Sequence, residues 1–200
     1  EQAHDIISSP TTRKAFDLSL EKPAEATRFG RHEFGQSLLL ASRLIESGVH
    51  FVTVRLRPAE FDFDTHTDNF SRLSNLLPPF DKGLASLIDR LKERGLFSST
   101  AIMVAGEFGR TPKVNNQGGR DHWARAMFAL MAGGDVRGGQ AIGETDKLAG
   151  EPNGSGYSPE DIAASFFQNI GISPQKEFQT NVGRPINLVR DGQPIKQLFS

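Results

Sequence analysis

A helical pattern followed directly by an apolar run occurs twice in the chain, and this order constrains the fold most. Apolar residues recur at helical spacing over Glu33–Ser47, and Gly48 follows where a left-handed C-terminal cap is needed. Val49–Leu56 then has the β-branched composition of a buried strand. The pattern returns as a helix over Pro79–Arg94 and a strand over Ala101–Ala105. Helices alternating with buried strands predict a layered α/β fold, with a sheet flanked by helices.

The remaining segments add to one predicted domain over the whole chain. A third strand is predicted over Ala126–Ala132 and a short one near Ala141–Ile142. We expect the three longer strands to share one sheet, with the leucine-rich faces of both helices packed on it. Residues 1–30 are polar and interrupted by prolines, which predicts a short helix followed by a loop, so this segment is expected to be irregular. Residues 31–200 form the regular part.

The C-terminal part has its own signals. Ser158–Asp161 combines an N-cap serine, a proline at the first helical position and an acidic residue three positions after the serine. The helix that starts there should run to about Ile170 and stop at Gly171. The tail over Ile186–Phe199 predicts a small hairpin that turns at Asp191–Gly192.

Composition excludes several classes of function. The formal net charge is −1 and the basic residues are scattered, which gives no electrostatic basis for binding nucleic acid or an anionic membrane. The chain has no cysteine, so disulfides, thiolate catalysis and zinc–thiolate sites are excluded. Its longest apolar stretch, Ala126–Ala132, is too short to span a bilayer. The first residues also lack the basic start and apolar core of a signal peptide.

Side chains able to bind a metal follow the first predicted strand. If the segment that follows is extended, Asp62, Asp64 and His66 fall on one face, because side chains alternate with a period of two. A carboxylate and an imidazole two residues apart can bind one divalent cation. Taken alone, the same residues fit a solvated acidic loop with an incidental histidine even better.

Two further groups of polar residues follow the second strand. Glu107 comes at its end, where a carboxylate needs a cation or hydrogen-bond donors, and an ion pair with Arg110 is the simpler explanation. Gly118–Trp123 then packs glycine, guanidinium, carboxylate and imidazole into six residues. The guanidinium of Arg120 suits a phosphate or sulfate oxyanion. A polar loop that Trp123 attaches to the core explains this segment equally well.

Together these residues predict a cluster of one or two divalent cations. The side chains in these segments that could bind such cations are Asp62, Asp64, His66, Glu107, Asp121 and His122. Zn²⁺ or Mn²⁺ fits the mixture of carboxylate and imidazole, whereas a site dominated by oxygen would favour Mg²⁺ or Ca²⁺. Arg110 and Arg120 are the candidate catalytic donors to a transferred oxyanion. The chain contains no Gly-x-Ser-x-Gly nucleophile elbow and no P-loop.

Three motifs in this order resemble the hallmarks of the DUF1501 family. They are Phe63–Phe70, Gly106–Pro112 and Gly119–Trp123, and the segment Gly138–Asp146 resembles the family as well. The similarity runs from about Ala15 to the C-terminus. One departure is the phenylalanine at the start of the first motif, where the family usually has tryptophan; it should leave the metal ligands unaffected.

The resemblance implies a place in the superfamily of alkaline phosphatases, sulfatases and phosphoglycerate mutases. Such proteins have a mixed sheet between helices, one or two metal ions, and a serine or threonine nucleophile that attacks a phosphorus or sulfur ester. It implies that Asp64 and His66 bind one metal, with Asp62 replacing Asp64 if the superfamily's Asp-x-x-x-His spacing applies. Glu107 would stand at the position of a strand-end aspartate, and His122 would be a later ligand, with Asp121 as an alternate. It also implies a bacterial protein exported to the periplasm, although the sequence is equally compatible with the cytoplasm.

The superfamily's nucleophile and one of its metal-binding aspartates precede the region that matches here. Nothing before Asp62 resembles that turn, and the nearby hydroxyls of Thr65, Thr67 and Thr111 do not precede a clear helix. We therefore expect either a fragment that hydrolyses small anionic esters only with its upstream residues present, or a shortened member that has lost the chemistry. The alternatives are a non-catalytic domain that binds metal or an anion, and an interaction module. The sequence does not indicate an oligomeric state.

Overall fold

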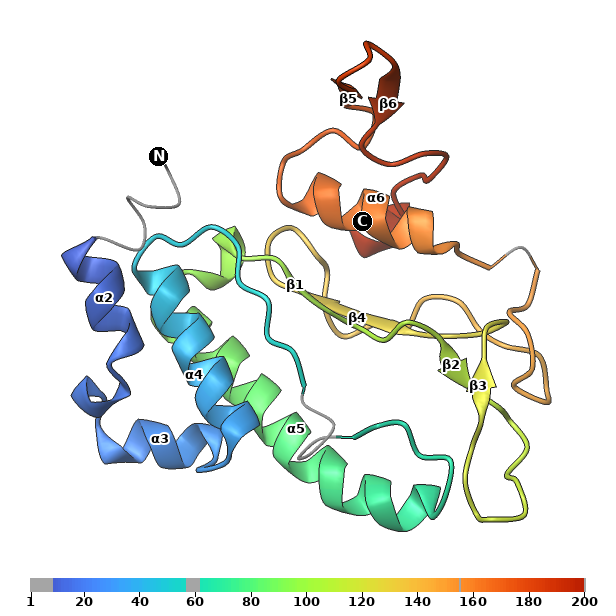
Figure 1. Cartoon of the computed structure of the whole chain (residues 1–200), viewed down its shortest axis with the longest axis horizontal. Coiled ribbons are helices and arrows are strands. Elements are labelled where there is room, and N and C mark those ends of the chain that lie inside the picture. The colour runs from blue at the N-terminus through green and yellow to red at the C-terminus, as the bar shows by residue number, and fades with distance from the viewer. Residues whose placement is uncertain (1–8, 57–61, 155, 200) are drawn as a thin grey trace. The chain divides into compact units, whose positions relative to one another are not determined.

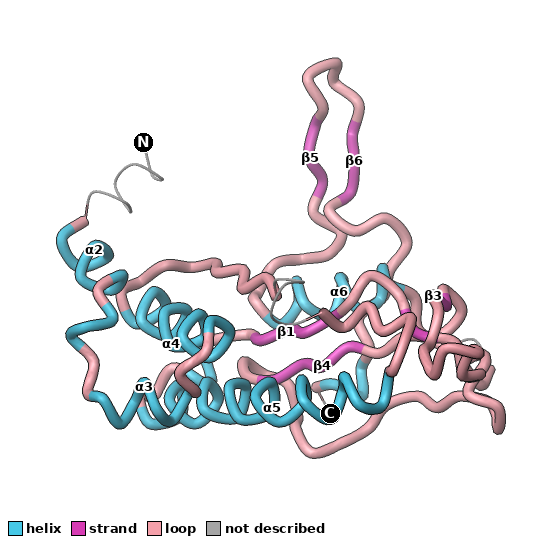
Figure 2. Tube along the Cα trace, turned by 60° about the horizontal axis from the view of Figure 1, so that its bottom comes forward, coloured by secondary structure: helices cyan, strands magenta, loops and turns pink. Residues whose placement is uncertain are grey.

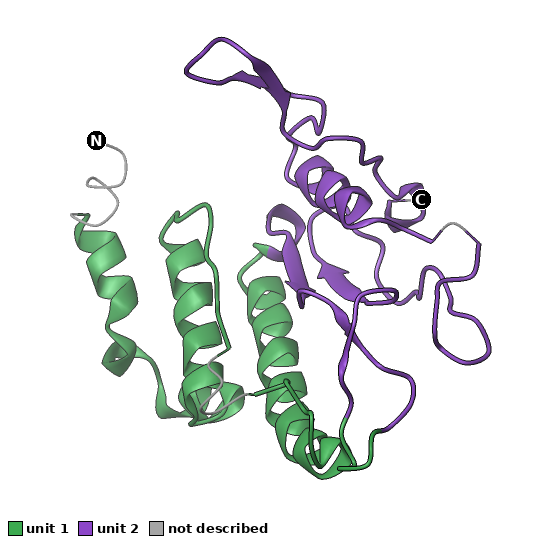
Figure 3. Cartoon of the chain, turned by 45° about the vertical axis from the view of Figure 1, so that its right-hand side comes forward, with its two compact units in different colours: residues 1–96, 115–119 green, residues 97–114, 120–200 purple. Residues whose placement is uncertain are grey.

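The computed structural model describes residues 9–56, 62–154 and 156–199. The chain divides into two compact units, which Figure 3 colours separately: residues 1–96 with 115–119 form unit 1, and residues 97–114 with 120–200 form unit 2. Unit 1 is helical, whereas unit 2 contains small antiparallel sheets and one longer helix. This mixture of helices and strands fits the predicted α/β class. The layering of a sheet between helices, as in alkaline phosphatases, stays a prediction.

The described residues of unit 1 form four α-helices and a short 3-10 turn (Figure 1). These are α2 (Pro10–Phe16), η1 (Leu18–Leu20), α3 (Pro23–Phe29), α4 (Glu33–Glu46) and α5 (Asn69–Glu93). The short helix predicted before residue 31 is therefore present as α2, but the loop predicted after it was wrong, because η1 and α3 lie there. Residues 1–8 lie outside the described residues. The two prolines of residues 9–30 begin helices α2 and α3 instead of interrupting a loop, because the first turn of a helix does not need the missing N–H group.

Helix α4 confirms the prediction made for Glu33–Ser47 almost residue for residue. At its start, the backbone N–H of Gly35 donates to Nδ1 of His32 over 3.2 Å, which caps one of the free N–H groups. At its end, Gly48 has a φ of +90°, and Val49 N–H donates to the Leu44 carbonyl over 3.0 Å. Both ends are fixed by local contacts, which is why the sequence alone located them.

Helix α5 begins ten residues before Pro79, so the predicted start was wrong. Its first N–H groups find partners far along the chain: Asp68 donates to the Gln117 carbonyl over 3.1 Å, and Asn69 donates to the Gly118 carbonyl over 3.0 Å. The helix continues through Pro79, at the cost of a backbone hydrogen bond. A contact between distant residues, which no local pattern reveals, therefore sets this helix start.

The core of unit 1 lies between helices. Helices α4 and α5 pack along each other, as Figure 3 shows, and α3 packs against both. The buried apolar side chains on these helices are Phe29, Phe34, Leu38, Leu39, Ala41, Leu87 and Leu91. Burial of each large apolar side chain stabilises the fold by about 1.5–3 kcal/mol. In unit 1, the leucine-rich faces of α4 and α5 therefore pack against each other. The expectation that these faces also pack on a sheet stays a prediction.

Arg90 of α5 is buried in this helical unit and holds three acidic side chains together. Its side chain is 2 % exposed. The guanidinium donates to Glu46 over 2.7 Å, to Glu21 over 3.0 Å and to Glu25 over 3.1 Å. Arg43 of α4 also donates to Glu21. These ion pairs join the N-terminal helices to α4 and α5, and they satisfy a charge that would otherwise be costly to bury.

The same network makes the stability of unit 1 sensitive to acid. Hydrogen bonding to Arg90 holds the pKa of Glu21 below its ordinary value of 4.5, and Arg43 contributes in the same direction. A carboxyl group with a lowered pKa stabilises the fold fully above its ordinary pKa and progressively less as pH falls toward the lowered value. We therefore expect the free energy of unfolding, measured with urea, to fall as pH decreases below about 4.5.

The variant Glu21→Gln provides the control for this pH dependence. It keeps the size of the side chain but cannot ionise, so the fall in stability below about pH 4.5 should be smaller in the variant than in the parent chain. An identical pH profile for both proteins would assign the acid sensitivity to other carboxyl groups.

Three antiparallel two-stranded sheets are found in the described part of unit 2. The first pairs β1 (Ile102–Ala105) with β4 (Ala129–Ala132), so two of the three predicted strands do share a sheet. The third prediction was wrong, because Val49–Leu56 forms no strand. Exposure still alternates along residues 51–56, as expected for a half-buried strand. The side-chain pattern therefore predicted a strand, but no described segment pairs its backbone with these residues.

The other elements of unit 2 are β2 (Gly109–Arg110) paired with β3 (His122–Trp123), helix α6 (Pro159–Asn169), the β5–β6 hairpin (Glu177–Gln179 and Pro185–Asn187), and the 3-10 turns η2 (Phe97–Ser99) and η3 (Lys196–Leu198). Helix α6 begins at the predicted capping box and stops before Gly171, whose φ is +75°. The predicted hairpin position was wrong: the chain turns between Thr180 and Arg184, as Figure 2 shows, and not at Asp191–Gly192. Ala141–Ile142 forms no strand either.

Across the described parts of the chain, none of the helices combines the length and the apolar character needed to cross a membrane.

Candidate metal centre

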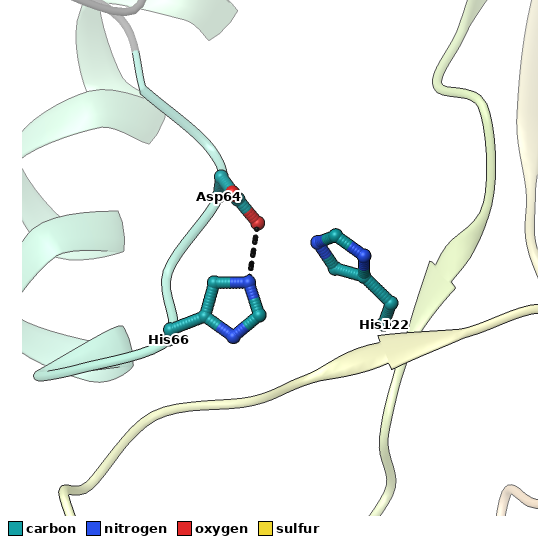
Figure 4. A group of neighbouring side chains, drawn as sticks. All are labelled: Asp64, His66 and His122. Atoms are coloured by element: carbon teal, nitrogen blue, oxygen red, sulfur yellow. Dashed lines mark ion pairs between the residues drawn. The ribbon is translucent and has the colours of Figure 1, made fainter.

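The segment that leads into α5 presents a carboxylate and an imidazole together. Oδ1 of Asp64 lies 3.0 Å from Nε2 of His66, and both side chains are about half exposed (Figure 4). Between them, Thr65 is buried, and its hydroxyl donates to Oδ1 of Asn69 over 2.6 Å. The inward position of Thr65 leaves its two neighbours on the outside, where they can bind a cation.

The backbone here is turned, although the prediction assumed an extended chain. Thr65 N–H donates to the Phe63 carbonyl over 2.9 Å, and His66 N–H donates to the Asp64 carbonyl over 3.1 Å. Hydrogen bonds between residues two apart are those of γ-turns. In consecutive γ-turns, the direction of the side chains repeats about every two residues. The alternation that brings Asp64 and His66 to one side is therefore kept.

Asp62, the alternative ligand to Asp64, has another role. Its Oδ2 accepts a hydrogen bond from Nη2 of Arg72 over 2.9 Å, and its Oδ1 accepts one from the Asp64 N–H over 3.0 Å. These contacts join the segment to α5 and neutralise the carboxylate. The geometry therefore favours Asp64 over Asp62 as the metal ligand.

A loop from later in the chain holds the backbone of His66 in place. Nδ2 of Asn115 donates to the His66 carbonyl over 3.0 Å, and Oδ1 of Asn115 accepts from the Gly119 N–H over 2.9 Å. Thr67 and Gly118 form an isolated β-bridge. A Cβ on Gly119 would lie 1.8 Å from the His66 carbonyl oxygen, so only glycine allows this approach. The role of Asn115 was not predictable from the sequence, because a lone asparagine in a loop carries no recognisable signal.

In unit 2, the β2–β3 ladder places His122 directly opposite Arg110. Opposite residues of an antiparallel pair share a face, with Cβ atoms about 4.5–5.5 Å apart. The His122 ring also contacts the Phe108 ring, with centroids 4.2 Å apart. An imidazole and a guanidinium thus lie together on one face of this ladder.

Arg120, the second predicted anion donor, is engaged with backbone. Its Nη1 donates to the Thr111 carbonyl over 2.6 Å and to the Pro112 carbonyl over 2.7 Å. It therefore holds the loop that connects β2 to β3. Arg110 donates from Nη1 to the Arg120 carbonyl over 3.4 Å, a longer contact. Of the two arginines, Arg110 is better placed beside His122.

The chain itself limits how far His122 can lie from His66. His122 lies only three positions after Gly119, which contacts the His66 backbone. Three residues span at most about 11 Å when fully extended. Asp64, His66 and His122 form a candidate His/Asp metal-binding triad, drawn in Figure 4.

Other predicted residues do not belong to this triad. Glu107, after β1, and Asp121, before His122, are both exposed. Their roles as ligands stay predictions. The hydroxyl of Thr111 donates to the Lys113 carbonyl over 2.9 Å and accepts from the Asp121 N–H over 3.1 Å. With Thr65 buried, two of the three hydroxyls considered as nucleophiles are held in structural hydrogen bonds.

The donor set of the triad fits a borderline divalent cation. Two imidazoles and one carboxylate match the ligands of Zn²⁺ and Mn²⁺, whereas Ca²⁺ and Mg²⁺ prefer sites made of oxygen. Three protein ligands also leave a coordination position for water or substrate, as catalytic zinc sites require.

Fold and site together define a protein of mixed helix and strand with a candidate metal-binding triad. The family model described as "Protein of unknown function (DUF1501)" matches residues 1–199, so the chain belongs to this family. The match confirms the family resemblance and extends it to the N-terminal side of Ala15. No curated protein and no solved structure matches the chain significantly.

Proposed function

We propose that the chain binds a divalent metal ion, Zn²⁺ or Mn²⁺, through Asp64, His66 and His122, and that the bound ion serves the hydrolysis of phosphate or sulfate esters. The observation that carries the proposal is the half-exposed pair of Asp64 and His66, whose ligand atoms lie 3.0 Å apart. A carboxylate and an imidazole at this separation can both reach a metal at a bond length of about 2.0–2.2 Å.

The surroundings of His122 support an anionic substrate. Arg110 lies opposite His122 in the ladder, so its guanidinium can donate hydrogen bonds to an oxyanion held near that imidazole. A bound divalent ion would act as a Lewis acid on the same ester oxygens. The residues of the chain would orient the ester and stabilise its negative charge. This combination is the basis of the proposed likeness to alkaline phosphatases and sulfatases.

A non-catalytic domain that binds metal or an anion is the second candidate. It is favoured by the hydroxyls near the triad, since Thr65 is buried and Thr111 is held between two backbone groups. A hydrolase of the proposed kind needs an activated nucleophile. If the chain binds metal but supplies no nucleophile, it would retain anions without cleaving their esters.

Metal binding is tested by titrating the metal-free chain with Zn²⁺ and with Mn²⁺ in a calorimeter. Removal of a residue that only supports a metal ligand typically lowers metal affinity by about 10–100-fold. We expect His66→Ala and His122→Ala, which remove the ligands themselves, each to lower the metal affinity by more than this. His50→Ala is the matched control, because His50 is exposed and outside the triad. Equal affinities for the parent chain and both triad variants would refute the proposed centre.

Catalysis is tested with the metal-loaded full-length protein on aryl phosphate and aryl sulfate esters. Turnover that is lost in His66→Ala and strongly reduced in Arg110→Ala is the result expected for the hydrolase. Metal-dependent binding of inorganic phosphate or sulfate without any turnover would instead favour the non-catalytic candidate.

A further inference from the structure

The ladder that carries His122 is too short to orient it alone. Strands β2 and β3 form only two residue pairs, Gly109 with Trp123 and Arg110 with His122. Two-stranded pairings are marginally stable even when longer. A metal ligand must nevertheless keep its ring direction, because a metal centre tolerates small errors of position only. Other contacts must therefore hold β3.

The indole of Trp123, next to His122, makes such a contact with a distant turn. Nε1 of Trp123 donates to the Gly150 carbonyl over 2.7 Å. The Gly150 N–H in turn donates to Oδ1 of Asp146 over 2.6 Å. Backbone hydrogen bonds of 2.9 Å from Asp146 to the Glu151 carbonyl, and from Ala149 to the Asp146 carbonyl, close the turn. The Gly150 carbonyl is thus a fixed acceptor.

A second contact holds the indole of Trp123 in the same place. The guanidinium of Arg125 lies over the indole, 5.6 Å from its centroid, and pairs with Glu151 of the same turn. On the partner strand, a Cβ on Gly109 would lie 1.8 Å from the Ala126 carbonyl oxygen, so β2 is closely packed here as well. The indole is therefore held by a hydrogen bond at its nitrogen and by a cation at its face.

We infer that the turn Asp146–Glu151 positions His122 through Trp123, so that Asp146 and Trp123 are positioning residues of the metal centre. Adjacent side chains of a strand point to opposite faces, so an indole fixed on one face sets the direction of the imidazole on the other. The inference rests on the proposed function, since it assigns a role only if His122 binds metal. It also gives a role to the C-terminal end of the family motif Gly138–Asp146.

The test uses the full chain loaded with Co²⁺, whose visible absorption spectrum reports the geometry of its ligands. Trp123→Phe removes the indole donor, and Asp146→Ala removes the acceptor that fixes Gly150. We expect both variants to change the Co²⁺ spectrum and to lower Co²⁺ affinity by about 10–100-fold. Asp146→Asn keeps an acceptor oxygen, so it should restore the parent spectrum and affinity.

Leu148→Ala is the control in the same turn, since Leu148 is 80 % exposed. It should leave spectrum and affinity unchanged. Thermal unfolding is measured in parallel. If Trp123→Phe and Asp146→Ala only lower Tm while the Co²⁺ spectrum and affinity stay those of the parent, the turn is purely structural and the inference is overturned. If His122→Ala itself leaves Co²⁺ binding unchanged, the proposed metal centre fails first, which is a distinguishable result.

Discussion

Replacing Arg90 with methionine is expected to lower the free energy of unfolding by about 3–5 kcal/mol, the usual cost of removing one partner of a buried ion pair. Methionine fills much of the same volume, so the loss comes from charge and not from a cavity. Glu21, with a side chain 12 % exposed, would be left facing Glu25 and Glu46 with Arg43 as its remaining cation. Urea denaturation followed by circular dichroism measures the change.

Arg94→Met is the matched control for this prediction. Arg94 belongs to the same helix end but is 55 % exposed, and its Nε lies 3.7 Å from Glu46. Exposed ion pairs of this kind contribute about 0–1 kcal/mol. Arg90→Lys should recover only part of the stability, because an ammonium cannot donate to three carboxylates in the planar pattern of a guanidinium. A loss of less than about 1 kcal/mol in Arg90→Met would show that the acidic side chains rehydrate freely.

The second large effect is expected for Gly119→Ala. A Cβ at this position would lie 1.8 Å from the His66 carbonyl oxygen, so the loop must move away from the segment that carries Asp64 and His66. Forced expansion of a well-packed contact costs about 1–3 kcal/mol. The movement should also weaken Zn²⁺ binding by at least about tenfold, since residues that support a ligand typically contribute 10–100-fold. Calorimetric titration and urea denaturation measure the two effects separately.

Asn116→Ala is the control for Gly119→Ala, because Asn116 is exposed in the same loop. It should leave both stability and Zn²⁺ affinity unchanged. Parent-like metal affinity in Gly119→Ala, at any stability, would mean that this loop does not support the metal centre.

The parts of the fold that the sequence predicted well are fixed by contacts within a few residues. Helix α4 has its N-terminal cap at His32 and its terminating glycine at Gly48, and α6 has its capping box at Ser158 and Asp161. Each signal lies at a set spacing from the helix that it bounds. The proximity of Asp64 and His66 also depends on a local spacing. Their side chains point to one side in an extended backbone and in the observed turned backbone, because side-chain direction repeats about every two residues in both.

The parts that the sequence did not predict depend on distant partners. Helix α5 begins at Asn69 because carbonyl groups of Gln117 and Gly118 accept its first N–H groups. Val49–Leu56 has the composition of a strand but lacks a partner among the described residues. The contact between Trp123 and Gly150 spans 27 residues of chain. None of these pairings leaves a local pattern.

The boundary between the two units has a practical consequence for dividing the protein. Unit 1 is discontinuous: after Leu96 the chain leaves it, returns for Asn115–Gly119, and leaves again. A shortened protein that ended at Leu96 would contain all of α5 but lose the carbonyl groups that cap its start and the asparagine that holds His66. Residues 115–119, in the middle of the connection from β2 to β3, are thus an internal part of the helical unit, and separate expression of that unit would require grafting them onto it.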